Sequence, residues 1–222
     1  MKPLGMCFGL VGWWQSRRGQ VHVDGRCVMR WTVIDCETSG LDARQDELLA
    51  IGGIAVVIGP AGVAIEPADS FEVLMRPRRV SDRDNILVHG IGREAQESGA
   101  EPGEALKRFI DWVQGAPLVA FHAPFDQAFI ERACHANGIL PPAGPWLDLA
   151  QLAPAVLPDR KLHTLDQWLE AFDMKVETRH CAPFDALGTA QLLAALYAKA
   201  RPHPASALRE LRQLAKAARW LG

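Results

Sequence analysis

The sequence lacks several features that identify whole classes of protein. Its five cysteines are scattered along 222 residues and include no CxxC pair. This spacing argues against a disulfide framework and favours a reducing, cytoplasmic compartment. Basic residues are not in excess, because the formal net charge is -2. A broadly basic nucleic-acid coat is therefore excluded, whereas an enzyme that handles a few nucleotides through bound metal is not.

Long apolar runs are also scarce, and the only segment that suggests a targeting signal is at the start. MKPLGMCFGLVGWW is apolar, but glycines interrupt it and it is too short for a membrane-spanning helix. Arg17 and Arg18 follow the apolar part, which reverses the layout of a secretory signal. We expect no membrane association. Residues 1–28 are predicted to form a poorly ordered N-terminal extension, with Met29 as an alternative natural start.

The composition that is present, 49% hydrophobic and 23% charged, is that of a globular domain with a substantial core. Apolar runs with β-strand character predict four strands, at residues 28–34, 47–58, 71–75 and 117–121. Residues 47–58 are apolar on both alternating faces, which favours a position inside the sheet. Residues 147–152 are too short to assign.

Helical spacing of apolar residues predicts five helices, at residues 104–113, 124–136, 164–172, 184–199 and 205–219. Thr164 and Gln167 form a capping box at the start of the third. Adjacent strands followed by helix–strand–helix alternation indicate an α/β fold with a mixed sheet. No repeat or low-complexity segment accompanies this pattern.

Two carboxylates follow the first predicted strand directly. In WTVIDCETSGLD, Asp35 and Glu37 flank Cys36. Residues two apart on a strand project from the same face, so the carboxylates lie together while Cys36 faces the opposite side. Neighbouring carboxylates repel each other, and a divalent cation neutralises them best. Taken alone, the pattern favours a solvated strand end, since the TSG that follows is typical of a turn.

Two further aspartates stand at predicted helix starts. Asp126 follows the apolar strand of VAFHAPFDQAFI, and Asp185 follows His180 by five residues in RHCAPFDALGTAQLL. Interaction with the helix dipole explains either aspartate alone, and an ordinary loop position explains the histidine. Chance does not easily explain their joint occurrence in this order.

In this order the motifs resemble the DEDD-type 3'-5' exonucleases of the histidine subclass. That family includes the proofreading (epsilon) subunit of bacterial DNA polymerase III, RNase T and oligoribonuclease. The resemblance covers about residues 30–197 and is most specific to epsilon-type members in DCETSGL, VHGI and the segment 180–189. It implies an RNase H-like three-layer fold, with a central mixed five-stranded sheet flanked by helices. We assign this domain to residues 29–200 and a C-terminal helix to residues 201–222.

The resemblance also implies roles for individual residues. Four acids would hold two Mg²⁺ or Mn²⁺ ions: Asp35, Glu37, Asp126 and Asp185. His180 would take the proton from the attacking water, a role that its unperturbed pKa of about 6.5 suits. The expected reaction is hydrolysis at the 3' end of single-stranded DNA with release of 5'-mononucleotides, in proofreading or repair.

Other residues match the family less closely. Thr38, Leu41 and His89 correspond to positions that line the pocket of the 3'-terminal nucleotide, although a turn or core role fits them nearly as well. The family usually has His-Asn at the fifth and fourth positions before the middle aspartate, where this chain has Phe121 and His122. This departure affects how the backbone near the aspartate would be held.

Four questions stay open at this point. RNA is the alternative substrate, because the same site cleaves either backbone and the 2'-hydroxyl is read by a few contacts. A non-catalytic nucleic-acid-binding module is disfavoured, because all four acids are present. Beside the 3' ends that the enzyme would bind, a DNA polymerase or another replication protein is a candidate partner, but a stand-alone or loosely associated exonuclease fits the sequence equally well. The oligomeric state is open.

A basic stripe marks the last predicted helix. Its members recur at intervals of three and four residues: Arg209, Arg212, Lys216 and Arg219. An adjoining apolar face, with Leu211 and Ala215, is suited to dock on the domain. The stripe itself is typical of a solvated helix face, and contact with the nucleic-acid backbone is the alternative.

Overall fold

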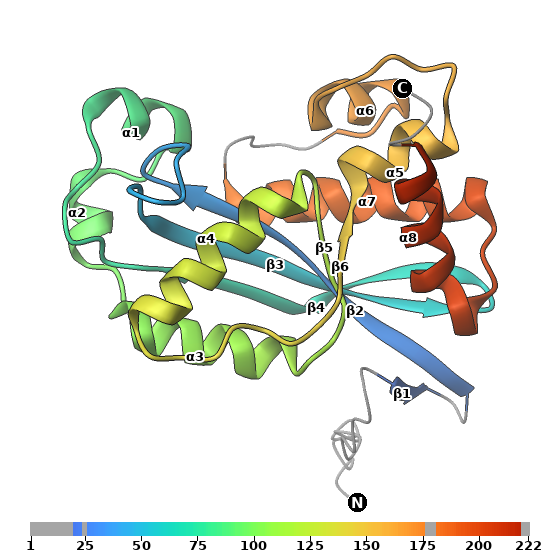
Figure 1. Cartoon of the computed structure of the whole chain (residues 1–222), viewed down its shortest axis with the longest axis horizontal. Helices are drawn as coiled ribbons and strands as arrows, with labels where there is room; N and C mark the ends of the chain where they lie inside the picture. The colour runs from blue at the N-terminus through green and yellow to red at the C-terminus, as the bar shows by residue number, and fades with distance from the viewer. Residues whose placement is uncertain (1–19, 24–25, 176–180, 219–222) are drawn as a thin grey trace, which may run out of the picture.

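The computed structural model describes residues 20–23, 26–175 and 181–218, and these form a mixed sheet between two groups of helices (Figure 1). Five strands follow the order β4-β3-β2-β5-β6 across the sheet. Their bounds are β2 Arg26–Thr38, β3 Leu48–Gly59, β4 Gly62–Leu74, β5 Leu118–Ala120 and β6 Trp146–Asp148. The short strand β1 (Gln20–Val23) pairs with the start of β2, outside this path. Strands β2, β3 and β4 pair antiparallel, whereas β5 and β6 continue the sheet in parallel. The predicted α/β fold with a mixed five-stranded sheet is confirmed.

Helices cover both faces of the sheet. Their bounds are α1 Arg83–His89, α2 Arg93–Glu97, α3 Pro102–Val113, α4 Ala123–Ala136, α5 Leu149–Val156, α6 Leu165–Ala171, α7 Ala182–Ala200 and α8 Ala207–Ala218, with a 3-10 turn at Pro204–Ser206. Side chains alternate along β2, so its apolar residues contribute to the hydrophobic core on both faces of the sheet. Val33 packs in the cluster that includes residues of α7, and Ile34 packs in the cluster that includes residues of α3 and α4.

Most predicted elements are confirmed, with boundaries that differ by a few residues. The strand at residues 47–58 is β3, which lies between β2 and β4 and is buried over nearly its whole length. The first strand continues to Thr38, so Asp35 and Glu37 lie within β2 and not beyond it. The capping box of Thr164 and Gln167 is present at the start of α6.

Two expectations from the sequence were incomplete. β4 begins at Gly62, well before the predicted start at Phe71. The sequence signal is weak because Val73 is the only buried residue of this edge strand and because the strand contains Pro67. The short helices α1 and α2 were not predicted. Residues 147–152 contain the end of β6 and the start of α5.

The two ends of the chain concern the predicted division into an N-terminal extension, an exonuclease domain and a C-terminal helix. Residues 1–19 of the expected extension lie outside the described residues, whereas residues 20–23 pair with β2. Leu211 and Ala215 of α8 are buried in the same core cluster as residues of α5 and α7. The division at residues 29–200 and 201–222 stays a prediction. Over the described parts of the chain, no helix is both long enough and apolar enough to cross a membrane.

Candidate active site

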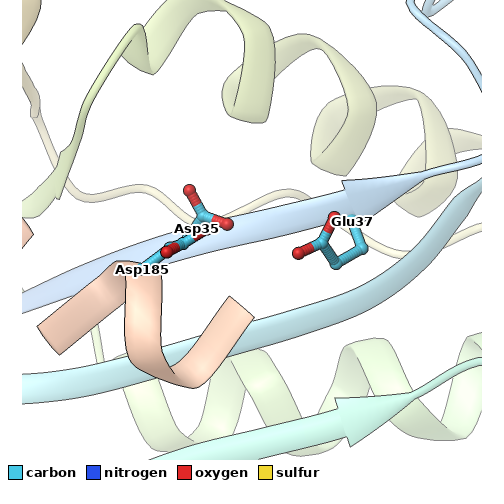
Figure 2. A group of neighbouring side chains, drawn as sticks. All are labelled: Asp35, Glu37 and Asp185. Carbon is cyan, nitrogen blue, oxygen red and sulfur yellow. The ribbon is translucent and has the colours of Figure 1, made fainter. Parts of the chain in front are cut away.

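Three carboxylates meet where β2 passes the first turn of α7. Asp35 and Glu37 project from β2 and Asp185 from α7, and one carboxylate oxygen from each residue lies within 4.8 Å of the other two. Figure 2 shows the carboxylate of Glu37 turned toward the other two. Asp185 is buried and the other two are half-buried. Strand alternation thus places the two acids of β2 on one face, as the sequence predicts.

The close approach of α7 depends on a glycine that sequence reasoning missed. Gly52 of β3 lies opposite Asp35 in the ladder between β2 and β3. A Cβ atom at Gly52 would lie 2.2 Å from the carbonyl carbon of Ala182 and from the nitrogen of Pro183. Only a residue without a side chain lets the start of α7, and with it Asp185, reach the sheet at this point. The available signal was the glycine pair inside the apolar run ELLAIGGIAVVI.

Asp126, the fourth predicted ligand, is not among the three clustered carboxylates. It lies buried in the first turn of α4, beside Cys36 of β2. Burial raises the pKa of Asp126 to about 7, although hydrogen bonding from the thiol and amide of Cys36 lowers it in part. The negative charge of Asp148 adds to the rise. Burial, and next the charge of Asp126, raise the pKa of the Cys36 thiol well above its usual value, so this thiol stays protonated.

The turn before Asp126 shows how this chain accommodates Phe121 and His122. His122 has a left-handed backbone with φ of 64°, a conformation in which asparagine and histidine are both enriched. Asp148 Oδ1 accepts hydrogen bonds from the backbone amides of His122, at 3.0 Å, and Ala123, at 3.3 Å. The carboxylate that caps α5 therefore also holds the start of α4. Asp148 thus holds this turn in place, although the chain has Phe121-His122 where the family usually has His-Asn.

The predicted base His180 lies outside the described residues. Of the three predicted pocket residues, Thr38 has a turn role, because its hydroxyl donates to the Gly40 carbonyl at 2.7 Å. Leu41 is 86% exposed on the loop that follows β2. The structure therefore leaves the Leu41 side chain available to a ligand.

His89, at the end of α1, is buried but keeps a free donor. Its Nδ1 accepts the backbone amide of Ile91 at 3.0 Å, and burial lowers the pKa of the imidazole. A neutral histidine that accepts at Nδ1 carries its proton on Nε2. Within the described residues, Nε2 has no hydrogen-bond partner. The ring can therefore donate one hydrogen bond to a bound molecule.

The loop that carries Leu41 is tied to two helices. Arg132 of α4 donates from Nη1 to the carbonyls of Ala43 and Asp46, each at 2.6 Å. Asn85 of α1 donates to the carbonyl of Ser39. These contacts hold the loop beside the carboxylates, and none of them was foreseen, because the partners are far apart in sequence.

Comparison with known families identifies the chain. The family model described as Exonuclease, that of RNase T, matches residues 32–193. The chain belongs to the RNase T family of exonucleases. The resemblance to DEDD-type exonucleases is confirmed, and the matched residues include all three clustered carboxylates.

Curated relatives of this exonuclease domain include much longer proteins. The PolC-type DNA polymerase III of Listeria monocytogenes is 32% identical over 163 residues, and that of Bacillus subtilis is 28% identical over 164 residues. Each alignment covers 73% of this chain and 11% of the relative. The chain therefore spans about a tenth of the length of these polymerases.

Solved structures share the fold at low identity. E. coli exonuclease I in complex with a dT13 oligonucleotide matches with a TM-score of 0.65 and 14% identity, over 78% of this chain and 42% of that one. Cell-death related nuclease 4 matches with a TM-score of 0.66 and 16% identity, over 76% of this chain and 64% of that one. These matches support the RNase H-like architecture of the exonuclease.

Proposed function

We propose that this exonuclease is a divalent-metal-dependent 3'-5' enzyme that degrades single-stranded DNA and releases 5'-mononucleotides. The observation that carries the proposal is the cluster of Asp35, Glu37 and Asp185, in which one oxygen from each carboxylate lies within 4.8 Å of the other two. Three carboxylates this close repel one another in the absence of a cation. Binding of a positive charge between them removes that repulsion.

The donor set suits Mg²⁺ or Mn²⁺, because every ligand atom of the cluster is a carboxylate oxygen and none is sulfur or imidazole nitrogen. We propose that the three clustered acids and Asp126 hold two such ions. Asp126, with a pKa of about 7, would give up its proton to take part. When bound, the ions supply the positive charge that stabilises the attacking and leaving oxygens at phosphorus.

In the proposed reaction, His180 accepts a proton from the attacking water. The water oxygen forms a bond to phosphorus, and the bond between phosphorus and the 3' oxygen of the preceding nucleotide breaks. The leaving 3' oxygen takes a proton from solvent, so the products are a mononucleotide with a 5'-phosphate and a strand that ends in a 3'-hydroxyl. A histidine with an ordinary pKa near 6.5 is suited to this transfer near neutral pH.

Leu41 and His89 support a pocket for the terminal nucleotide. The exposed Leu41 side chain offers an apolar surface against which a base can pack, and the Nε2 proton of His89 offers a hydrogen bond to the sugar or base. DNA is favoured over RNA because E. coli exonuclease I binds a dT13 oligonucleotide and the PolC-type relatives are DNA polymerases. The similarity to PolC-type DNA polymerases also supports a DNA polymerase as the proposed protein partner, in replication or repair.

Degradation of end-labelled strands tests the proposal. With Mg²⁺ or Mn²⁺, a 3' label should be released at once as a mononucleotide, while a 5' label should remain on a ladder of shortening strands. Excess chelator should stop both the release of the 3' label and the shortening of the 5'-labelled strand. Internal cuts, or full activity in chelator, would contradict the proposal. A matched RNA strand is the second arm, and faster loss of the RNA would favour the exoribonuclease alternative.

A further inference from the structure

A cavity with a basic lining lies near the candidate active site. It has a volume of about 560 Å³, and its lining includes Arg79, Ser81, Asp82, Arg83 and Arg93. The cavity belongs to α1, α2 and the segment before them. Figure 1 shows these two helices beyond the end of β2 at which Glu37 and Thr38 lie.

The three arginines of the cavity are available to an anion. Among the described residues, the ion pairs of Arg79 and Arg93 are all exposed, to Asp82 at 3.8 Å and to Glu97 at 3.4 Å. Exposed pairs of this kind contribute little free energy, so a competing anion replaces them readily. Within the described residues, Arg83 has no ion-pair partner at all.

A buried side chain holds the two halves of the cavity together. Gln96 of α2 is fully buried, and its Oε1 accepts the backbone amide of Ser81 at 2.9 Å. Its Nε2 donates to the carbonyl of Ile91 at 2.8 Å. The segment that carries Arg79 and the turn before Arg93 are therefore fixed relative to each other, which lowers the entropy cost of binding a ligand between them.

Ser81 adds an unexplained donor to the same cavity. Its side chain is 8% exposed, and its hydroxyl has no hydrogen-bond partner among the described residues. A buried hydroxyl without a partner costs stability, so such a group calls for a reason. A ligand atom that accepts this hydroxyl would provide one.

We propose that the cavity binds a backbone phosphate of the substrate strand, away from the bond that is cut. Guanidinium groups match phosphate geometry with paired hydrogen bonds. The position favours the substrate strand as the source: His89 ends α1 and Asn85 contacts the loop of Leu41, so the cavity adjoins the residues proposed to receive the 3' nucleotide. Arg83 and His89 are separated by about 9 Å of helix. The proposal rests on the proposed function and adds a site that positions the strand.

The test compares two double variants of equal charge in the full chain. Arg79→Gln with Arg83→Gln removes two charges from the cavity. Lys199→Gln with Arg201→Gln removes two charges from the C-terminal end of α7, which lies at the opposite end of the sheet (Figure 1). All four side chains are at least partly exposed, so both variants should fold, which circular dichroism checks.

Binding of a fluorescent single-stranded oligodeoxynucleotide is measured in chelator over a range of salt concentrations. The cavity variant should bind about 10-fold more weakly, and its salt slope should fall by about 0.7 for each phosphate that it no longer neutralises. The α7 variant should match the wild type. Ser81→Ala should weaken binding a few-fold and leave the salt slope unchanged, because a hydroxyl displaces no counterion.

Three outcomes would overturn the proposal. Equal weakening in the α7 variant would show general charge attraction and not a site. Unchanged affinity and slope in the cavity variant would show that the strand does not reach the cavity. Thermal stabilisation of the wild type by inorganic phosphate, without any effect of the variants on strand binding, would assign the cavity to a free phosphate. A wild type without nuclease activity would instead overturn the proposed function, and the chelator measurement would still test the cavity.

Discussion

Gly52 lies directly opposite Asp35 across the ladder of β2 and β3, and the backbone of Ala182 and Pro183 fills the space that a side chain at Gly52 would need. This relationship makes the distance between Asp35 and Asp185 a property of three elements, β2, β3 and α7. A residue with no functional group thereby determines whether the carboxylates can share a cation.

Gly52→Ala should separate the start of α7 from the sheet and reduce nuclease activity by about 100-fold, since displacement of catalytic groups by about 1 Å has effects of this size. The matched control is Gly53→Ala. Its Cβ would lie 2.7 Å from Cη2 of Trp112, on the other face of the sheet. Both substitutions overpack the core, at a cost of about 1–3 kcal/mol in the free energy of unfolding. Equal loss of activity per unit of lost stability would show that Gly52 matters only for folding.

His180→Ala should lower the turnover rate by a factor of about 10²–10⁴, which is the usual contribution of general base catalysis. Affinity for Mn²⁺ should stay near that of the wild type, because His180 is proposed to move a proton and not to bind metal. The acidic limb of the pH–rate profile should also change. Turnover close to that of the wild type would place the base elsewhere and refute the assignment to the histidine subclass.

Asp126→Asn should change how stability depends on pH in the absence of metal. The folded pKa of Asp126 is about 7, above its ordinary value of 3.8. As the pH rises between these values, the unfolded chain loses this proton while the folded chain keeps it, so the wild type loses stability. Asparagine cannot ionise, so the variant avoids this loss.

Urea unfolding in chelator checks the effect of Asp126→Asn. The stability advantage of the variant over the wild type should be larger at about pH 8 than at about pH 5. Other acids titrate in both proteins and therefore cancel in the comparison. An advantage that is constant over this range would show that Asp126 ionises normally.

Arg132→Gln should release the loop of residues 39–46 from α4, because it removes the donor to the carbonyls of Ala43 and Asp46. We expect KM for a single-stranded oligonucleotide to rise several-fold with a smaller change in kcat, since the loop carries Leu41 and not a clustered carboxylate. Arg108→Gln, at an exposed position of α3, serves as the control. A purely structural role would lower stability and leave KM unchanged.

The sequence predicts those parts of the site that depend on local periodicity. Asp35 and Glu37 share a face because strand side chains alternate. Asp126 and Asp185 begin helices because each follows the segment Ala-Pro-Phe, in which proline suits the first turn. Such signals lie within a few residues of the acid that they place.

The remaining features depend on contacts between distant segments. Gly52 takes its role from α7, which follows it by about 130 residues. The separation of Asp126 from the other three acids depends on how α4 packs beside Cys36, and the basic cavity depends on the hydrogen bonds of buried Gln96. The early start of β4 was missed because an edge strand has no need of a continuous apolar face.

Calorimetric titration of the metal-free protein with Mn²⁺ tests the central claim most directly, namely that the clustered carboxylates hold the metal. The wild type should show saturable binding, and Asp35→Asn or Asp185→Asn should weaken it by on the order of 10- to 100-fold or more. Asp159→Asn, at an exposed position outside the cluster, should bind as the wild type does. Equal Mn²⁺ affinity in the wild type and in both cluster variants would contradict the account.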